Sequence, residues 1–279
     1  MFGILQINKM RFHLDYPQIQ NDYQTSTKKL NWFPKSFPSL TFYKKMSAIV
    51  LRGAQLAKKG LYSDKEWCTS SYNILRAIES TGTKITVENL QPTLDLKVPA
   101  VVVGNHMSTL ETFLLPYMLS PHMKVTFVIK EALISYPIFK HIMISRNPIV
   151  VGRENPKRDF MKVLTEGVNR LKEGYTVIVF PQTTRMTVFE KSQFNSIGVK
   201  LAKRGNVPVI PLALKTDCWR NGKIIKDFGR IDPNKSVHFK FGTPLKIEEN
   251  GKTQQESVIK HIEDCLSKWT GKLPISDKI

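Results

Sequence analysis

Two kinds of hydrophobic spacing alternate along most of the chain. Short apolar runs bounded by turn residues, as at 99–103 and 175–180, are typical of buried strands. Between them, apolar residues recur at helical spacing, as in segment 155–174, where Asn155 and Pro156 form a helix start. Strands are expected at 84–87, 99–103, 124–129, 149–151, 175–180, 207–214, 237–241 and around Lys223, and helices at 108–119, 137–143, 155–174, 196–203 and 253–269. Strands separated by helices predict an α/β fold with a layered, central mixed sheet flanked by helices.

The beginning of the chain has a different pattern. Residues 15–38 contain three prolines and little periodicity, so irregular structure is expected there. From Ser39 onward, apolar residues return at helical spacing, and a second helix is expected to begin at Ser63, where Glu66 completes a capping box. We therefore divide the chain into a basic, aromatic N-terminal region with amphipathic helices, residues 1–81, and an α/β domain, residues 82–279.

Charge changes the picture of that N-terminal region. The formal net charge of the chain is +19, and residues 1–60 hold ten Lys and Arg against two acidic residues. The first of the two helices carries cationic residues opposite its apolar face: Lys44, Lys45, Arg52 and Lys58. A basic amphipathic helix near aromatic residues is typical of a protein that binds an anionic membrane surface. The alternative is a helix packed only against its own domain.

The spacing of the cysteines and the lengths of the apolar runs indicate where in the cell the protein is located. Cys68, Cys218 and Cys265 are far apart in sequence, which favours a reducing compartment. No run of eighteen apolar residues predicts a transmembrane helix, and the first thirty residues lack the apolar core of a signal peptide. We expect a cytoplasmic protein, peripheral on the inner face of the membrane.

Candidate chemistry gathers where predicted strands end. His106 follows the strand at 99–103, and Glu111 lies five residues further on. A histidine that a nearby carboxylate can orient is suited to act as a general base. Arg153 and Arg185 each follow another strand, and guanidinium groups bind phosphate with bidentate geometry. The remaining histidines show no metal-ligand spacing, so no metal site is expected: His13, His122, His141, His238 and His261.

Four blocks in this order resemble the glycerolipid acyltransferase family, typified by 1-acylglycerol-3-phosphate acyltransferase. They are the His106-x4-Glu111 segment, the strand that ends at Arg153, segment 180–185 and the proline-bracketed strand at 207–212. The resemblance covers about residues 82–245. It implies that residues 82–279 form an acyltransferase domain, with His106 as the base and Glu111 as the residue that orients it.

The resemblance also implies the substrates. Arg153 and Arg185 would hold the phosphate of the acceptor, with Gln182 and Thr184 as further substrate-binding residues. The base would activate a lysophospholipid hydroxyl for direct attack on an acyl thioester. The expected acceptor is 1-acyl-sn-glycerol 3-phosphate, which would give phosphatidic acid. Acyl-CoA or acyl-ACP would be the donor substrate, with no permanently bound cofactor. Backbone amides near the start of the helix at 108–119 are candidates for stabilising the oxyanion.

Two departures from the family pattern concern specificity. Position 111 is Glu where the family has Asp, so the pairing with His106 requires the backbone to compensate for one methylene. The third block of the family reads Phe-Pro-Glu-Gly-Thr-Arg, and here Gln182 and Thr183 replace Glu and Gly. Because Gln182 carries no charge, the identity of the acceptor stays open.

Three functions therefore remain at this point. The first is acyl transfer to 1-acyl-sn-glycerol 3-phosphate. The second keeps the reaction but uses another acceptor, either glycerol 3-phosphate or a lyso-aminolipid. The third is a non-enzymatic protein that binds nucleic acid or another anionic surface, for which only the net charge of +19 and scattered aromatic residues speak. No nucleic-acid-binding motif supports it, so no nucleic acid partner is expected.

Overall fold

The computed structural model describes residues 10–26, 31–182, 184–222 and 226–271. Its strands are β1 (Tyr23–Gln24), β2 (Ile85–Glu88), β3 (Val101–Gly104), β4 (Lys124–Lys130), β5 (Ile149–Val151), β6 (Tyr175–Val179), β7 (Val209–Lys215) and β8 (Val237–Phe241). Its α-helices are α1 (Trp32–Ser36), α2 (Pro38–Lys58), α3 (Asp64–Glu79), α4 (Gln91–Leu94), α5 (Leu110–Leu119), α6 (Ala132–Ser135), α7 (Phe139–Ile144), α8 (Pro156–Lys172), α9 (Ile197–Gly205) and α10 (Lys252–Thr270). A short 3₁₀ helix, η1, spans Lys191–Gln193.

The described strands form one mixed sheet in the order β1-β2-β8-β7-β3-β6-β4-β5. β3 lies between β6 and β7 and is parallel to both. The β1–β2 and β7–β8 pairs are antiparallel, which makes the sheet mixed. The predicted α/β architecture is therefore confirmed. Because β3, β6 and β4 are parallel neighbours, the segments that follow them emerge at the same edge of the sheet.

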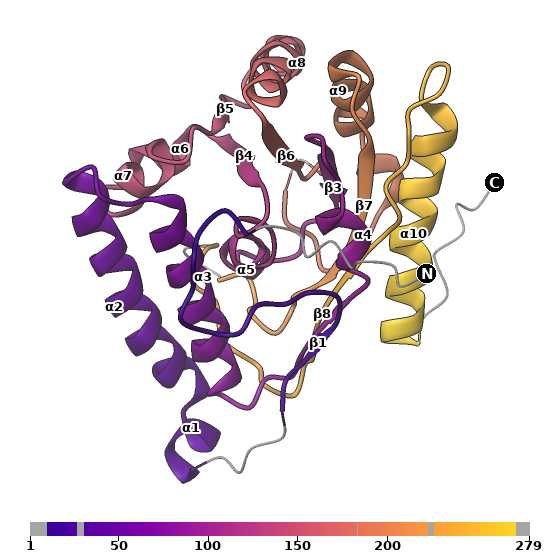
Figure 1. The fold of residues 1–279 in the computed structure, drawn as a ribbon. Coiled ribbons are helices and arrows are strands. Elements are labelled where there is room, and N and C mark those ends of the chain that lie inside the picture. The colour runs from indigo at the N-terminus through magenta and orange to yellow at the C-terminus, as the bar shows by residue number, and fades with distance from the viewer. Residues whose placement is uncertain (1–9, 27–30, 183, 223–225, 272–279) are drawn as a thin grey trace, which may run out of the picture.

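Helices cover both faces of this sheet (Figure 1). Side chains of successive strand residues point to opposite faces, so Val102 joins one hydrophobic cluster and Val101 and Val103 the other. The cluster around Val102 includes residues of α2, α3 and α5, whereas the second cluster includes residues of α8, α9 and α10. The apolar runs in β3, β6 and β7 follow from this double coverage.

The two N-terminal helices pack against the α/β part of the chain. Phe42 and Met46 of α2 and Ile74 of α3 are buried in the same cluster as Val102. The predicted capping box at the start of α3 is present on one side, because Ser63 Oγ accepts a hydrogen bond from the Glu66 N–H. One face of α2 thus packs on its own protein, whereas its cationic face is exposed: Lys44, Lys45, Arg52 and Lys58. The division of the chain at residue 81 stays a prediction.

The expectation of irregular structure at 15–38 was wrong in part. β1 pairs with β2, and α1 covers Trp32–Ser36. Both are very short, and α1 contains Pro34, so neither has a periodicity that a sequence pattern reveals. The strand expected around Lys223 falls partly on residues 223–225, which lie outside the described part. Within the described ranges, no helix combines the length and hydrophobicity needed to cross a bilayer.

Candidate active site

The turn that carries His106 is fixed to the end of β3. Asn105 Nδ2 donates to the Leu214 carbonyl oxygen, and the Leu214 N–H donates to Asn105 Oδ1, both at 2.8 Å. This pair continues the β3–β7 ladder through a side chain that is 2% exposed. The backbone of Gly104 also passes close to β7, since a Cβ there would lie 3.0 Å from the Leu212 carbonyl oxygen. These contacts determine where the next residue, His106, leaves the sheet.

His106 and Glu111 lie together, as their spacing predicts. Their Nδ1 and Oε1 atoms are 2.8 Å apart, and the Glu111 side chain is fully buried. Glu111 belongs to the first turn of α5, where the backbone brings the longer glutamate within reach of the histidine. If Nδ1 donates to the carboxylate, the Nε2 lone pair is left on the opposite side of the ring. His106 itself lines a cavity.

Glu111 also accepts hydrogen bonds that the sequence did not predict. Oε1 accepts from the Met107 and Ser108 N–H groups at 2.7 and 2.9 Å. Oε2 accepts from Ser108 Oγ at 2.9 Å and from Thr216 Oγ1 at 2.6 Å. Burial raises the pKa of Glu111, but hydrogen bonding and attraction from His106, followed by the bonds from Thr216 and Ser108, lower it to below its ordinary value. The carboxylate is therefore held as an anion.

These hydrogen bonds engage backbone amides that were expected to stabilise an oxyanion. The amides of Met107 and Ser108 donate to Glu111, and the Leu110 N–H donates to Ser108 Oγ. The amides of Met107 and Ser108 thus stabilise the Glu111 carboxylate, and the Leu110 amide orients the Ser108 hydroxyl. The expectation that such amides stabilise an oxyanion is not met by these three donors.

Segment 180–186 holds His106 from a second side. The Phe180 ring stacks on the imidazole at a centroid distance of 4.6 Å and an interplanar angle of 6°. Gln182 Oε1 accepts from the His106 N–H at 2.7 Å, and the Met186 N–H donates to the His106 carbonyl oxygen at 2.8 Å. Gln182 is 2% exposed and lies outside the cavity lining, so it contacts the histidine backbone from behind. Thr183 lies outside the described residues.

The two predicted arginines meet at the rim of the cavity. Arg185 forms a hydrogen bond with Thr109 Oγ1 and an ion pair with Asp227 at 2.8 Å. Arg153 has a positive φ of 68°, and Asp159 Oδ2 accepts its backbone N–H at 2.6 Å. Desolvation lowers the pKa of Arg153, repulsion from Arg185 lowers it further, and Asp159 raises it. The two arginines thus line one cavity, and their positive charges repel each other.

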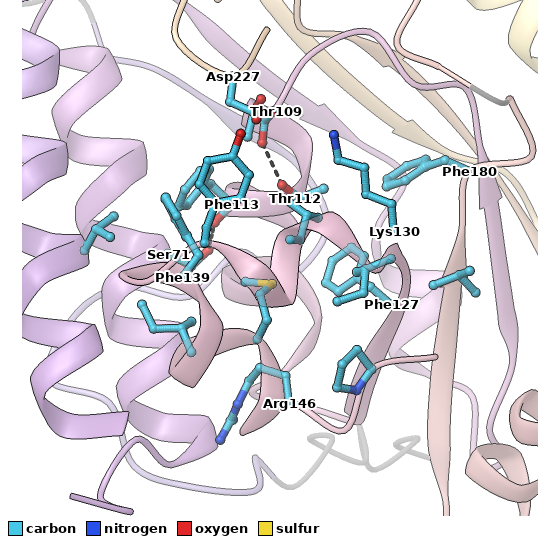
Figure 2. A pocket seen from close by; sticks show the side chains of 18 of the residues that line it. Ser71, Thr109, Thr112, Phe113, Phe127, Lys130, Phe139, Arg146, Phe180 and Asp227 are labelled. Atoms are coloured by element: carbon cyan, nitrogen blue, oxygen red, sulfur yellow. Dashed lines mark hydrogen bonds between the residues drawn. The ribbon is translucent and has the colours of Figure 1, made fainter. Parts of the chain in front are cut away.

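A cavity of about 280 Å³ extends from this cationic rim into the protein. Figure 2 shows Asp227, Thr109 and Lys130 at one end and Arg146 at the other, with Phe113, Phe127 and Phe139 between them. Thr184, Arg153 and Arg185 line the cavity together with His106. Arg146 is paired with Asp64 at 2.7 Å and lies over the rings of Tyr62 and Trp67. The cavity thus has a polar mouth, an apolar body and an ion pair at its far end.

Several residues of this site have no signal in the sequence. Thr216 and Asp227 reach it from segments more than a hundred residues after His106, and no local pattern relates them to it. Ser108 could have been found, since a serine three residues before a carboxylate at a helix start is a capping pattern. No cluster of three or more His, Cys, Asp or Glu side chains suited to a metal occurs among the residues with described positions.

Comparison with known proteins agrees with this architecture. Residues 84–215 match the model of a family described as acyltransferase. A 1-acyl-sn-glycerol-3-phosphate acyltransferase of Pseudomonas aeruginosa is 30% identical over 149 residues, which cover 53% of this chain and 55% of that protein. One from Cocos nucifera is 24% identical over 199 residues, covering 71% of this chain and 60% of that protein. This chain thus spans little more than half the length of these relatives.

A solved structure has the same fold. The crystal structure of the 1-acyl-sn-glycerophosphate acyltransferase PlsC from Thermotoga maritima superimposes with a TM-score of 0.60. The alignment covers 84% of this chain and 95% of that one, at 20% sequence identity. At this identity the likeness establishes the fold of the chain.

Proposed function

We propose that this chain, whose residues 84–215 match the model of the acyltransferase family, transfers a fatty acyl group from a thioester to the hydroxyl of 1-acyl-sn-glycerol 3-phosphate. The product is phosphatidic acid. The observation that carries the proposal is the His106–Glu111 pair, 2.8 Å apart, which faces a cavity with an arginine rim and an apolar body. The same cavity thus offers a base, an anion-binding site and an apolar surface to one substrate.

The chemistry is direct acyl transfer. His106 Nε2 takes the proton of the acceptor hydroxyl while Glu111 holds the Nδ1 proton and stabilises the imidazolium that forms. The hydroxyl oxygen attacks the thioester carbonyl, and a carbon–oxygen bond forms. When the tetrahedral intermediate collapses, the carbon–sulfur bond breaks and the proton passes from Nε2 to the thiolate. A positioned base contributes on the order of 10²–10⁴-fold to the rate of such a step.

The rim arginines select the acceptor. Arg185, whose side chain is 10% exposed, and Arg153 both line the cavity with His106. Desolvation and then repulsion from Arg185 lower the pKa of Arg153. A phosphate bound between them would relieve that repulsion, and guanidinium groups suit phosphate oxygens. Thr184 is exposed at the same rim and can donate a hydroxyl hydrogen bond. We assign Gln182 to positioning His106, because its carbonyl oxygen is committed to the histidine N–H.

The apolar body of the cavity binds the acyl chain of the lysophospholipid acceptor. Phe113, Phe127 and Phe139 line it, and Ile49 and Val50 of α2 close it from the side. A hydrocarbon chain in contact with these side chains leaves water, which favours binding by roughly 25 cal/mol per Å² of buried apolar surface. The donor substrate is acyl-CoA or acyl-ACP, and the free CoA or ACP leaves after transfer.

An anionic membrane surface is the proposed partner of the N-terminal region, residues 1–81. α2 exposes its cations, and α1 and the α1–α2 junction, which directly precede it in the chain, expose the apolar side chains of Trp32, Phe33 and Phe37. Lipid substrates reside in the membrane, so a peripheral location on the cytoplasmic inner face suits the reaction.

An acceptor panel tests this proposal. Purified protein is supplied with one acyl-CoA or one acyl-ACP, and with lysophosphatidate, glycerol 3-phosphate or a lyso-aminolipid in anionic vesicles. Product masses identify the acceptor. We expect phosphatidic acid to form fastest. Preferred acylation of glycerol 3-phosphate or the lyso-aminolipid would replace the acceptor assignment, and the absence of any acylated product would refute the proposal.

A further inference from the structure

A carboxylate stands in the cationic rim of the cavity. Asp227 lines the same cavity as His106 and Thr184, and its side chain is 18% exposed. Figure 2 shows it beside Thr109, at the end of the cavity toward which Lys130 also extends. The acyl-transfer chemistry proposed above makes no use of this acid.

Asp227 occupies a position suited to a phosphate oxygen. One terminal nitrogen of Arg185 contacts Thr109 Oγ1, and the other pairs with Asp227 Oδ1 at 2.8 Å. The guanidinium has five N–H donors in one plane, so a phosphate can bind Arg185 while Asp227 stays paired with it. The aspartate carboxylate and the acceptor phosphate would then interact with the same side chain, and their negative charges would repel each other.

The segment that follows Asp227 is anchored to α2 and to Trp219. The carbonyl oxygen of Gly229, two residues further on, accepts from the Tyr43 hydroxyl of α2 at 2.5 Å. That hydroxyl accepts in turn from Trp219 Nε1 at 3.0 Å, and the ring of Phe228 lies 6.1 Å from that of Tyr43. The negative charge thus belongs to an anchored segment and contributes to the field of the site whenever a substrate arrives.

We infer that Asp227 sets the headgroup selectivity of the acceptor site. This inference rests on the proposed acyl transfer. Of the described residues that line the cavity, four cationic side chains lie at the rim, Lys130, Arg153, Arg185 and Lys226, and Asp227 is an acid among them. A fixed negative charge repels a phosphomonoester, with close to two negative charges, more than a phosphodiester, with one. The arginines favour phosphomonoester over phosphodiester acceptors, and the charge of Asp227 therefore reduces this preference.

Asp227→Asn tests the inference because it removes the charge and keeps the shape. The quantity is the ratio of kcat/KM for lysophosphatidate, a phosphomonoester, to kcat/KM for lysophosphatidylglycerol, a phosphodiester. We expect this ratio to rise roughly 3- to 30-fold in the variant. Asp227→Glu, which retains the charge, is expected to keep a ratio close to that of the wild type. An unchanged or lower ratio in Asp227→Asn would overturn the inference.

A matched control removes a neighbouring charge outside the cavity. Asp232 pairs with Arg220 at 2.7 Å and is 19% exposed, so Asp232→Asn changes the net charge equally. Its headgroup ratio is expected to equal that of the wild type, and a rise like that of Asp227→Asn would reduce the effect to net charge and overturn the inference. The dissociation constants of the two lipids, measured by calorimetry, give the same ratio without turnover. If no lipid is acylated, the proposed function fails, whereas this binding ratio still decides the role of Asp227.

Discussion

At the scale of single residues, the contacts of Glu111 match the length of its side chain. Its two oxygens accept five hydrogen bonds, from His106, two backbone amides and two hydroxyls. The sequence predicted the pairing with His106 and left open how one additional methylene is accommodated. The answer lies partly in Thr216, which reaches the carboxylate from the end of β7.

Glu111→Gln is expected to lower kcat more than Glu111→Asp does. Glutamine has one acceptor oxygen and places an amide NH₂ among groups that all donate, whereas aspartate keeps the charge that stabilises the imidazolium. Initial rates with a saturating thioester and lysophosphatidate measure the difference. A Glu111→Gln variant as fast as Glu111→Asp would show that the carboxylate charge is not needed.

Gln182→Leu separates positioning from substrate binding. The substitution leaves the buried His106 N–H without its acceptor, which costs about 1–3 kcal/mol in stability or in distortion of the histidine turn. We expect kcat to fall while the KM for lysophosphatidate changes little. Thr184→Val provides the comparison, because Thr184 lines the cavity and its loss should raise KM. The reverse pattern would place Gln182 in contact with the acceptor.

At the scale of elements, α2 has two different faces. Phe42, Met46 and Val50 are buried against the rest of the protein, whereas the cations of the opposite face are exposed. Leu40 shares the helical spacing of the apolar residues of α2, but this residue is 57% exposed. It lies close in sequence to Trp32, Phe33 and Phe37, which are also exposed. Exposed apolar residues of this kind are unusual unless something covers them.

Replacing Trp32 and Phe33 by serine is expected to weaken binding to anionic vesicles, most visibly at high salt. Salt screens the cations, so the binding that survives depends on inserted apolar side chains. Co-sedimentation with vesicles over a salt series measures it. Met161→Ser is the control, because Met161 is 47% exposed on α8, which covers the other face of the sheet. Equal loss in both variants, or none in either, would argue against an interfacial role for α1.

Local pattern predicted most elements of the fold because their hydrophobic spacing is strong. The strands β3, β6 and β7 are buried on both faces, and their apolar runs are correspondingly clear. α6 (Ala132–Ser135) was missed because a single helical turn has no period, and the strand ends at Val103 and Phe180 moved by one residue. In the site, His106, Glu111 and the arginines were predictable from adjacent strand ends. Thr216 and Asp227 were not, since only the fold brings them near.

At the scale of the whole molecule, partly buried histidines couple stability to pH. Burial lowers the pKa of His122, His238 and His261 in the folded protein. Below the ordinary histidine pKa of about 6.5, the unfolded chain binds more protons than the folded protein does. The free energy of unfolding should therefore fall as the pH decreases from about 7.5 to 5.5, by at most about 1.4 kcal/mol per pH unit for each histidine.

His122→Leu should reduce this pH dependence. Among described residues, neither ring nitrogen of His122 has a hydrogen-bond partner, so leucine removes a titrating group without leaving a polar group unpaired. Chemical denaturation at pH 7.5 and 5.5 gives the two free energies for each protein. A pH dependence as steep as that of the wild type would show that His122 does not contribute.

The most direct test of His106 as the general base is the turnover of a purified His106→Ala variant with acyl thioester and lysophosphatidate. His106 is held by Glu111, Phe180 and Gln182, and these contacts have a catalytic purpose only if the imidazole takes the acceptor proton. Circular dichroism and vesicle binding should show a folded protein. We predict that kcat falls on the order of 10²–10⁴-fold with a nearly unchanged KM for lysophosphatidate. Turnover close to that of the wild type would contradict the proposal that His106 is the general base.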